Sequence, residues 1–259
     1  MKNYYLYLLL FFLGSTTTLQ AQTMQKFVLV EHFTNTYCGI CSSRNPALNE
    51  VMDQYEGQIH RISIHPSVPY SQCPLYQYNT EDNGARQTYY TVRGTPTMQI
   101  DGVRSSSSAS IFESDLQSAL TASAGLQILV EESDGLSRSV DVTIDAEIDY
   151  PNADYRIFVA LVEANLMFQA NNGENEHFDV LRDFLTAPEG DPLTLPAAGQ
   201  QIQLQYSVDI PGDVNQQEAY ILVYVQNLET GEVLNSGTRF DETTVSTTDL
   251  STIADMQVY

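Results

Sequence analysis

The stretch FVLVEHFTNTYCGIC, residues 27–41, places an apolar, β-branched run just before two cysteines that are separated by two residues. The run has the composition of a buried strand. After the cysteines, apolar residues recur with helical spacing at positions 48, 51, 52 and 55, which predicts a helix with one buried face. Cys38 and Cys41 are therefore expected between the end of a strand and the start of a helix.

A cysteine pair at this position has three interpretations: a redox couple, a structural disulfide or half of a metal site. A helix N-terminus stabilises a thiolate, so Cys38, just before the first turn, is expected to be the exposed nucleophile. Cys41, one turn later, would resolve the mixed disulfide. A bridge that closes so short a loop restrains little chain entropy, which argues against a purely structural role. A permanently oxidised or vestigial pair stays open.

The metal interpretation requires two further ligands, and the chain offers no second close pair of cysteines or histidines. The remaining candidates are scattered along the sequence: His32, His60, His65, Cys73 and His177. No metal site and no other cofactor is predicted. The acidic residues around His177 are expected to form a solvated turn.

Strand and helix patterns alternate along the first half of the chain. Residues 59–66 and 94–102 indicate strands, and residues 79–92 indicate a helix. Ser110 and Glu113 form a possible capping box at the start of another helix. This alternation predicts a central sheet covered by helices.

Near Gly125 the hydrophobic period changes to two. Residues 140–149 and 201–210 alternate between apolar and polar, whereas residues 155–168 and 219–227 are apolar on both faces. This pattern predicts an immunoglobulin-like, all-β antiparallel sandwich of about seven strands. The expected organisation is a signal peptide at 1–21, an α/β domain at 22–124, the sandwich at 125–241 and a polar tail at 242–259.

The N-terminus and the charge limit the location and the partners. Lys2, an apolar run at 4–13 and small or polar residues to Ala21 have the order of a secretory signal peptide, so export to the periplasm, cell surface or medium is expected. No later stretch reaches the ~18 to 20 apolar residues of a transmembrane helix. A net charge of -22 argues against nucleic acid as a partner.

Two of these segments resemble the thioredoxin superfamily: FVLVEHFTNTYCGIC, with Pro46 in the helix that follows, and VRGTPTMQIDG at 92–102. The resemblance implies a thioredoxin-like α/β domain. It also implies a cis bond between Thr95 and Pro96, packed against the two cysteines, with the Thr95 backbone available to an extended substrate segment.

The chain departs from the thioredoxin pattern at two positions. Tyr37 stands where the superfamily usually carries Trp and is expected to contact substrate. His32 stands where an acidic residue commonly lies beneath the cysteine pair. It is either a proton relay or a core histidine, and because side chains alternate along a strand, Glu31 beside it must face the other way.

The order of the signal peptide, the cysteine motif, RGTPT at 93–97 and a β-rich half with NGENEHFDVLRDFL at 172–185 resembles the 28-kDa outer-membrane-protein-related family of Bacteroidota. That family is described by its fold rather than by a settled reaction. The expected function is thiol-disulfide exchange on an extracytoplasmic thiol or disulfide protein, together with an unknown redox partner. The alternative is a non-enzymatic surface or secreted binding scaffold with an inert disulfide.

The third cysteine, Cys73, lies in a Pro- and Tyr-rich segment at 67–79. If Cys38 and Cys41 pair, Cys73 is left over. Burial, a link to another molecule and resolution of a mixed disulfide in trans are all open.

Overall fold

The first half of the chain forms strands and helices in alternation, as predicted. The computed structural model describes residues 24–241, so the expected signal peptide and polar tail lie outside the described residues. The elements in order are β1 (Val28–Phe33), α1 (Gly39–Asp53), β2 (Ile59–Ile64), α2 (Pro74–Tyr78), α3 (Thr80–Tyr89), β3 (Thr97–Ile100), β4 (Val103–Ser105) and α4 (Ala109–Ala119). β1 is parallel to β2 and antiparallel to β3.

Two local expectations for this half need correction. Helix α4 begins at Ala109 with Ser108 as its N-cap residue, so the capping box predicted at Ser110 is wrong by two positions. The short helix α2 was not predicted, because Pro74 at its first position also suits a loop.

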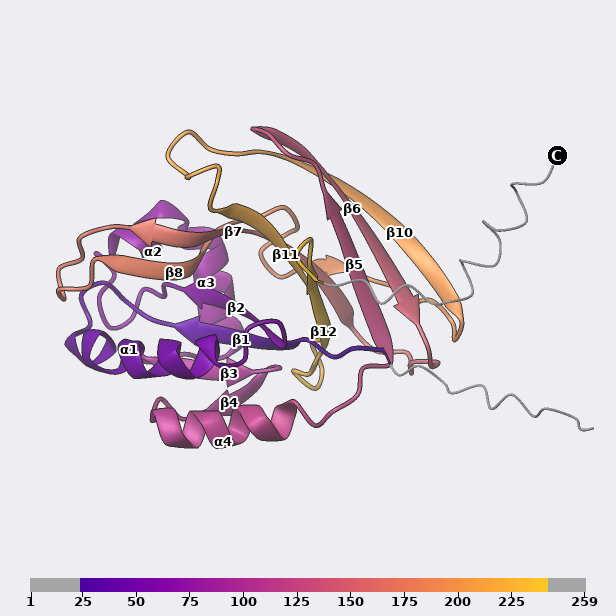
Figure 1. The fold of residues 1–259 in the computed structure, drawn as a ribbon, viewed down its shortest axis with the longest axis horizontal. Coiled ribbons are helices and arrows are strands. Elements are labelled where there is room, and N and C mark those ends of the chain that lie inside the picture. Colours follow the sequence, from indigo (N-terminus) through magenta and orange to yellow (C-terminus); the bar gives the residue numbers. More distant parts are fainter. Residues whose placement is uncertain (1–23, 242–259) are drawn as a thin grey trace, which may run out of the picture.

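The second half is made of antiparallel strands. They are β5 (Leu126–Glu132), β6 (Ser137–Ala146), β7 (Tyr155–Met167), β8 (Glu176–Phe184), β9 (Asp191–Pro192), β10 (Gln200–Asp209), β11 (Ala219–Asn227) and β12 (Val233–Thr238). β10, β6 and β5 form a three-stranded sheet. This sheet packs across an apolar core against one face of β7 and β11, as a sandwich requires (Figure 1).

The boundary expected near residue 125 does not separate two sheets. One nine-stranded sheet runs in the order β12-β11-β7-β8-β2-β1-β3-β4, with β9 beside β7. The two halves join where β8 runs parallel to β2, with Ser63 opposite Val180. The predicted sandwich therefore shares one of its sheets with the first half. Strands that are apolar on both faces can take such a central place, since both of their faces are covered.

The long sheet is covered on both faces. Helices α1 and α4 lie together on one face of the first half, over Val28 and Val30 of β1 (Figure 1). The three-stranded sheet covers β7 and β11 in the second half. Leu29 and Phe33 of β1 belong to a second core on the opposite face, with Phe158 of β7. Neighbouring residues of β1 thus serve different cores, which decides where Glu31 and His32 point.

A buried ion pair lies within the second of these cores. Arg86 of α3 binds Glu31 of β1 through Nη2 at 2.7 Å and through Nε at 2.9 Å. Its Nη1 donates to Oε1 of Gln226 in β11, and the Tyr90 hydroxyl donates to the second Glu31 oxygen. Four aromatic rings surround the guanidinium carbon at 4.8 to 5.6 Å: Tyr89, Tyr90, Phe158 and Tyr224. The pair connects α3, β1 and β11.

Replacing Arg86 should therefore be costly. In Arg86→Met, Glu31 stays buried without its counter-charge, and we expect the free energy of unfolding to fall by about 3 to 5 kcal/mol. Adding Glu31→Leu should recover part of the loss, because an apolar pair of similar size leaves no buried charge. Urea unfolding followed by circular dichroism measures all three proteins.

The matched control is Arg104→Met, at an exposed arginine in β4. Its free energy of unfolding should stay within about 0.5 kcal/mol of the wild type. The ion-pair account is wrong if Arg86→Met behaves like this control, or if the double variant is less stable than the single one.

Candidate functional site

Cys38 and Cys41 form a disulfide at the start of α1, as the redox and structural interpretations both predict. Cys38 is the N-cap residue, and its Sγ accepts a hydrogen bond from the Cys41 N–H at 3.1 Å. Cys38 is 4 % exposed and Cys41 is fully buried. The expectation of an exposed Cys38 is therefore wrong for the oxidised protein, since two other segments lie against it.

The first of these segments contains the Thr95–Pro96 bond, which is cis as the resemblance implied. The Thr95 carbonyl oxygen lies 3.4 Å from the Cys38 Sγ. The Thr95 hydroxyl is buried and has no hydrogen-bond partner among residues 24–241. Tyr37 is half-buried, and its ring lies 6.2 Å from that of Tyr70, centroid to centroid. Thr95 and Cys38 are thus brought together, with two tyrosines beside the cysteine loop.

The second segment is the hairpin loop between β7 and β8, residues 168–175, which sequence reasoning missed. The Asn172 N–H donates to the Thr36 carbonyl at 2.9 Å, and its Nδ2 donates to the Cys38 carbonyl at 3.1 Å. Glu174 accepts hydrogen bonds from Asn172 and from Asn45 of α1. The loop thus binds both the backbone that carries Cys38 and the helix that carries Cys41. The pairing of β8 with β2 places the end of this loop beside the first half.

His32 lies on the face of β1 that α1 covers, whereas Glu31 faces Arg86 on the other side, as strand alternation predicted. Burial lowers the pKa of His32 to about 4, an effect that the nearby Asn45 amide opposes and Arg61 reinforces. The side chain is 3 % exposed, and within the described part of the chain no group is placed to form a full hydrogen bond with its Nε2. His32 is therefore a neutral imidazole near pH 7. Its role as a proton relay stays a prediction.

The expectation of a solvated turn around His177 is wrong. Its ring is buried rather than in a solvated turn, with Nε2 3.0 Å from the Phe168 carbonyl oxygen. It lies 6.4 Å from the ring of His65, centroid to centroid, and burial lowers the pKa of both. Both rings and His32 line a cavity of about 20 Å³. Between residues 24 and 241, no three Cys, His, Asp or Glu side chains are placed to hold a metal ion.

Cys73 is buried and unpaired, which is one of the three possibilities left open. Its Sγ accepts a hydrogen bond from the Thr36 hydroxyl at 3.2 Å. Thr36 belongs to the loop that leads into Cys38, so the free thiol supports that loop from the side of the 67–79 segment. Its burial in a packed cluster with Leu75 and Val180 makes it a structural residue in this fold.

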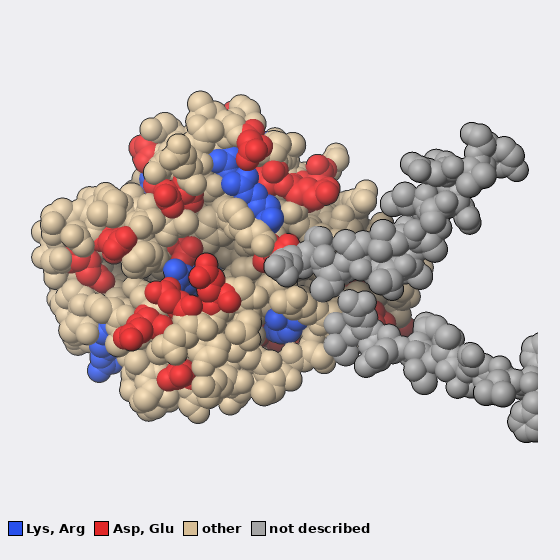
Figure 2. Space-filling model, viewed as in Figure 1, with Lys and Arg blue, Asp and Glu red and all other residues tan. Residues whose placement is uncertain are grey.

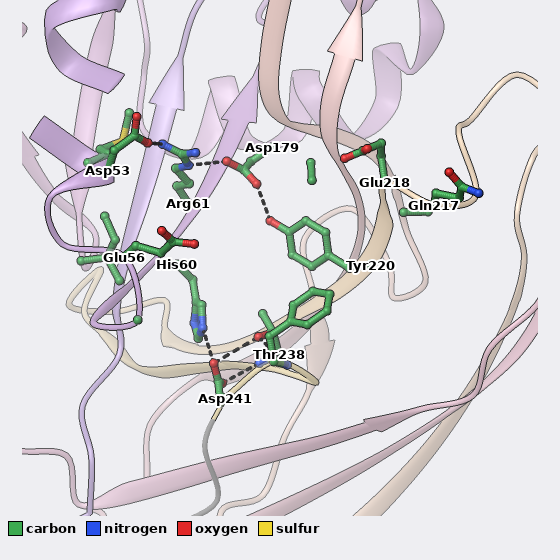
Figure 3. A pocket seen from close by; sticks show the side chains of 16 residues that line it. Asp53, Glu56, His60, Arg61, Asp179, Gln217, Glu218, Tyr220, Thr238 and Asp241 are labelled. Carbon is green, nitrogen blue, oxygen red and sulfur yellow. Dashed lines mark hydrogen bonds and ion pairs between the residues drawn. The ribbon is translucent and has the colours of Figure 1, made fainter. Parts of the chain in front are cut away.

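A larger cavity, of about 530 Å³, opens where the end of α1 and β2 meet β8, β11 and β12 (Figure 3). Arg61 lies between two carboxylates, bonded to Asp53 at 2.7 Å and to Asp179. Tyr220 donates its hydroxyl to Asp179 at 2.8 Å, and burial raises the pKa of that carboxyl. Acidic side chains also gather around a hollow on this face of the molecule (Figure 2).

His60 borders the same cavity, between the Ser236 hydroxyl at 2.8 Å and the Asp241 carboxylate at 2.9 Å. This set has the residue types of a hydrolytic triad, but Ser236 is fully buried and donates its hydroxyl to the Phe27 carbonyl. The serine is therefore not a nucleophile. Ser236 of β12 and Asp241, which follows β12, hold the His60 ring of β2 in place.

Comparison with protein families shows the family to which the chain belongs. The family model described as outer membrane protein Omp28 matches residues 83–239. The chain belongs to the Omp28 family. The matched segment contains Arg86 and the hairpin loop, but it begins after Cys38 and Cys41. The match thus includes two segments that lie against Cys38, the one with Thr95 and the hairpin loop. No curated protein sequence matches the chain.

Solved structures share the fold at low sequence identity. HBP35 of Porphyromonas gingivalis is 16 % identical, with 86 % of this chain and 79 % of that chain covered, at a TM-score of 0.72. Protein AGR_C_4864 from Agrobacterium tumefaciens is 12 % identical, with 88 % and 99 % covered, at a TM-score of 0.53. These likenesses concern the fold alone.

The description of the Omp28 family as an outer membrane protein agrees with the exported location expected from the sequence. Among the helices of the described part of the chain, none has the length and apolarity needed to span a bilayer.

The low pKa of His32 predicts a pH dependence of stability. The unfolded chain, with an ordinary histidine pKa of 6.5, binds more protons than the folded protein between pH 6.5 and about 4. The contribution of His32 to the free energy of unfolding is therefore at its full value above pH 6.5. It is lost as the pH falls toward 4, by about 3 kcal/mol in total. His32→Gln should remove that part of the slope, measured by urea unfolding from pH 7.5 to 4.5. Parallel curves for the two proteins would contradict the assignment.

Proposed function

We propose that this protein catalyses thiol-disulfide exchange on extracytoplasmic proteins through Cys38 and Cys41, in a thioredoxin-like first half. The observation that supports it most is the set of groups around Cys38. A disulfide lies at a helix N-terminus, the Cys38 Sγ accepts the Cys41 N–H, and the carbonyl before a cis proline lies 3.4 Å away. A sulfur that accepts a helix N–H is stabilised as a thiolate when the disulfide opens.

Exchange in the reducing direction has two steps. The Cys38 thiolate attacks one sulfur of a substrate disulfide, forms a mixed disulfide and releases the other substrate sulfur as a thiolate. The Cys41 thiolate then attacks the Cys38 sulfur, which releases the second substrate thiolate and forms the Cys38–Cys41 bond. The substrate gains two electrons, and the cysteine pair loses two. In the oxidising direction both steps reverse.

In this proposal Thr95 and Tyr37 contact the substrate. The Thr95 carbonyl lies beside the reacting sulfur, so the backbone there can bind an extended segment next to its cystine. Tyr37, with Tyr70, forms an aromatic border to the cysteine loop. Exchange takes place outside the cytoplasm, in the periplasm or at the cell surface, where disulfides persist.

Trapping of the mixed disulfide tests the division of labour between the two cysteines. In a Cys73→Ser background, Cys41→Ser leaves Cys38 without its resolving partner, and Cys38→Ser leaves only the buried Cys41. After incubation with oxidised glutathione, mass spectrometry should show the glutathione adduct on Cys38 forming faster, on the order of tenfold, because its thiolate is stabilised and closer to the surface.

Two results would argue against exchange. Equal adduct rates in the two variants would remove the assignment of Cys38 as the nucleophile. No adduct in either variant, although glutathione modifies both after unfolding in urea, would show that the folded protein shields the pair from substrates.

A binding scaffold with an inert disulfide is the second candidate function. It is favoured by the burial of both cysteines and by the family match, which lies wholly outside residues 38–41. Under this candidate the disulfide only fixes the start of α1, and the 530 Å³ cavity where the two halves meet becomes the binding site.

A further inference from the structure

A groove of about 1060 Å³ runs between α1 and the hairpin loop, and we call it the α1 groove. Five amide side chains and four carboxylates line it, and no lysine or arginine does. The carboxylates are Glu50, Asp53, Glu174 and Glu176. The groove is distinct from the cavity of Figure 3, although both reach Asp53 at the C-terminal end of α1.

Within residues 24–241, three of the four carboxylates of the α1 groove have no cationic partner: Glu50, Glu174 and Glu176. Asp53 pairs with Arg61, but Glu174 is bound by the neutral amides of Asn45 and Asn172. Glu176 is bound only by the Asn165 amide. Because neutral donors leave the charge of a carboxylate intact, the groove keeps a negative potential that attracts cations.

Asn45 at the edge of the α1 groove fixes one of its carboxylates. Asn45 is 5 % exposed, and its Nδ2 donates to Thr34 and to Glu174. Its side-chain oxygen is closed off from solvent, and the amide acts on His32. The negative charge of the groove therefore favours a positively charged ligand.

One end of the α1 groove lies one residue from the cysteine pair. Ser42, the residue after Cys41, lines it, and so does Asn172, which donates to the Cys38 carbonyl. A chain segment in the groove therefore lies beside the first turn of α1, which carries the disulfide. A saccharide fits less well, because sugars stack on open aromatic faces and the one aromatic ring in the lining, Phe178, lies under the Arg61 guanidinium at 5.6 Å.

We propose that the α1 groove binds an extended, lysine- or arginine-bearing segment of the protein whose disulfide is exchanged at Cys38. The inference rests on the proposed function for its substrate, but not for its binding step. Basic residues pair with Glu50 and Glu176, backbone N–H groups reach the amide and carboxylate oxygens, and the adjoining cystine lies at the N-terminus of α1.

Two variants with equal charge separate the groove from the general field of an acidic protein. Glu50→Gln with Glu176→Gln changes exposed carboxylates of the groove. Glu147→Gln with Glu189→Gln removes the same charge at exposed positions outside the groove lining. None of these four side chains forms a hydrogen bond with Cys38 or Cys41. Both double variants should therefore fold and keep the cysteine pair.

Binding is measured first, with fluorescent peptides that carry either four lysines or four glutamates around a serine in place of cysteine. The lysine peptide should bind more tightly, and the groove variant should weaken it on the order of tenfold, with a smaller effect at high salt. The remote variant should leave its affinity nearly unchanged. Equal weakening by both variants, or no preference for the lysine peptide, would overturn the proposal.

Exchange is measured next. Both peptides then carry cysteine at the serine position, joined to glutathione by a disulfide, and the reductant is the reduced Cys73→Ser protein. The rate constant should favour the basic peptide, and the groove variant should remove most of that preference. If binding depends on the groove but neither peptide exchanges, the groove stands and the proposed thiol chemistry fails. If both exchange at equal rates in every protein, the chemistry stands and the groove is not its substrate site.

Discussion

The Arg86–Glu31 ion pair, which also contacts Gln226 of β11, is the interaction on which the packing of α3 against the long sheet depends. A guanidinium enclosed by four aromatic rings must keep its counter-charge, because an unpaired buried charge costs several kcal/mol. Although burial lowers the Arg86 pKa, Glu31 raises it above the ordinary value overall. The aromatic enclosure comes from α3, β7 and β11, and the carboxylate comes from β1. Helix α3 therefore cannot leave the sheet without exposing or orphaning a charge.

A continuous sheet has a direct consequence for the cysteine pair. Pairing of β8 with β2 brings the hairpin loop beside α1, where Asn172 binds the Cys38 carbonyl and Glu174 binds Asn45. The chemical groups of the proposed site are thus in the first half, whereas one of its walls belongs to the second. The Omp28 match includes that hairpin loop and also Thr95, on the other side of Cys38.

Local patterns in the sequence were sufficient for most elements. Strand β1, helix α1, the disulfide and the buried strands β7 and β11 follow from hydrophobic period and cysteine spacing. The cis bond at Pro96 followed only from a resemblance, because spacing alone does not distinguish it from a strand-start proline. The α1 groove and the buried His177 could not be predicted, since both depend on which strand edge of one half pairs with the other. Hydrophobic period reports which faces are buried and not which strands are neighbours.

The reduction potential of the Cys38–Cys41 pair tests the central claim most directly. It is measured in glutathione buffers on the Cys73→Ser protein, so that only one pair titrates. The account predicts a value between about -270 and -120 mV, the range of thioredoxin-like catalysts, because the pair must exchange electrons with substrates. A value below about -300 mV, or no reaction in the folded state, would show a structural bridge and contradict the account.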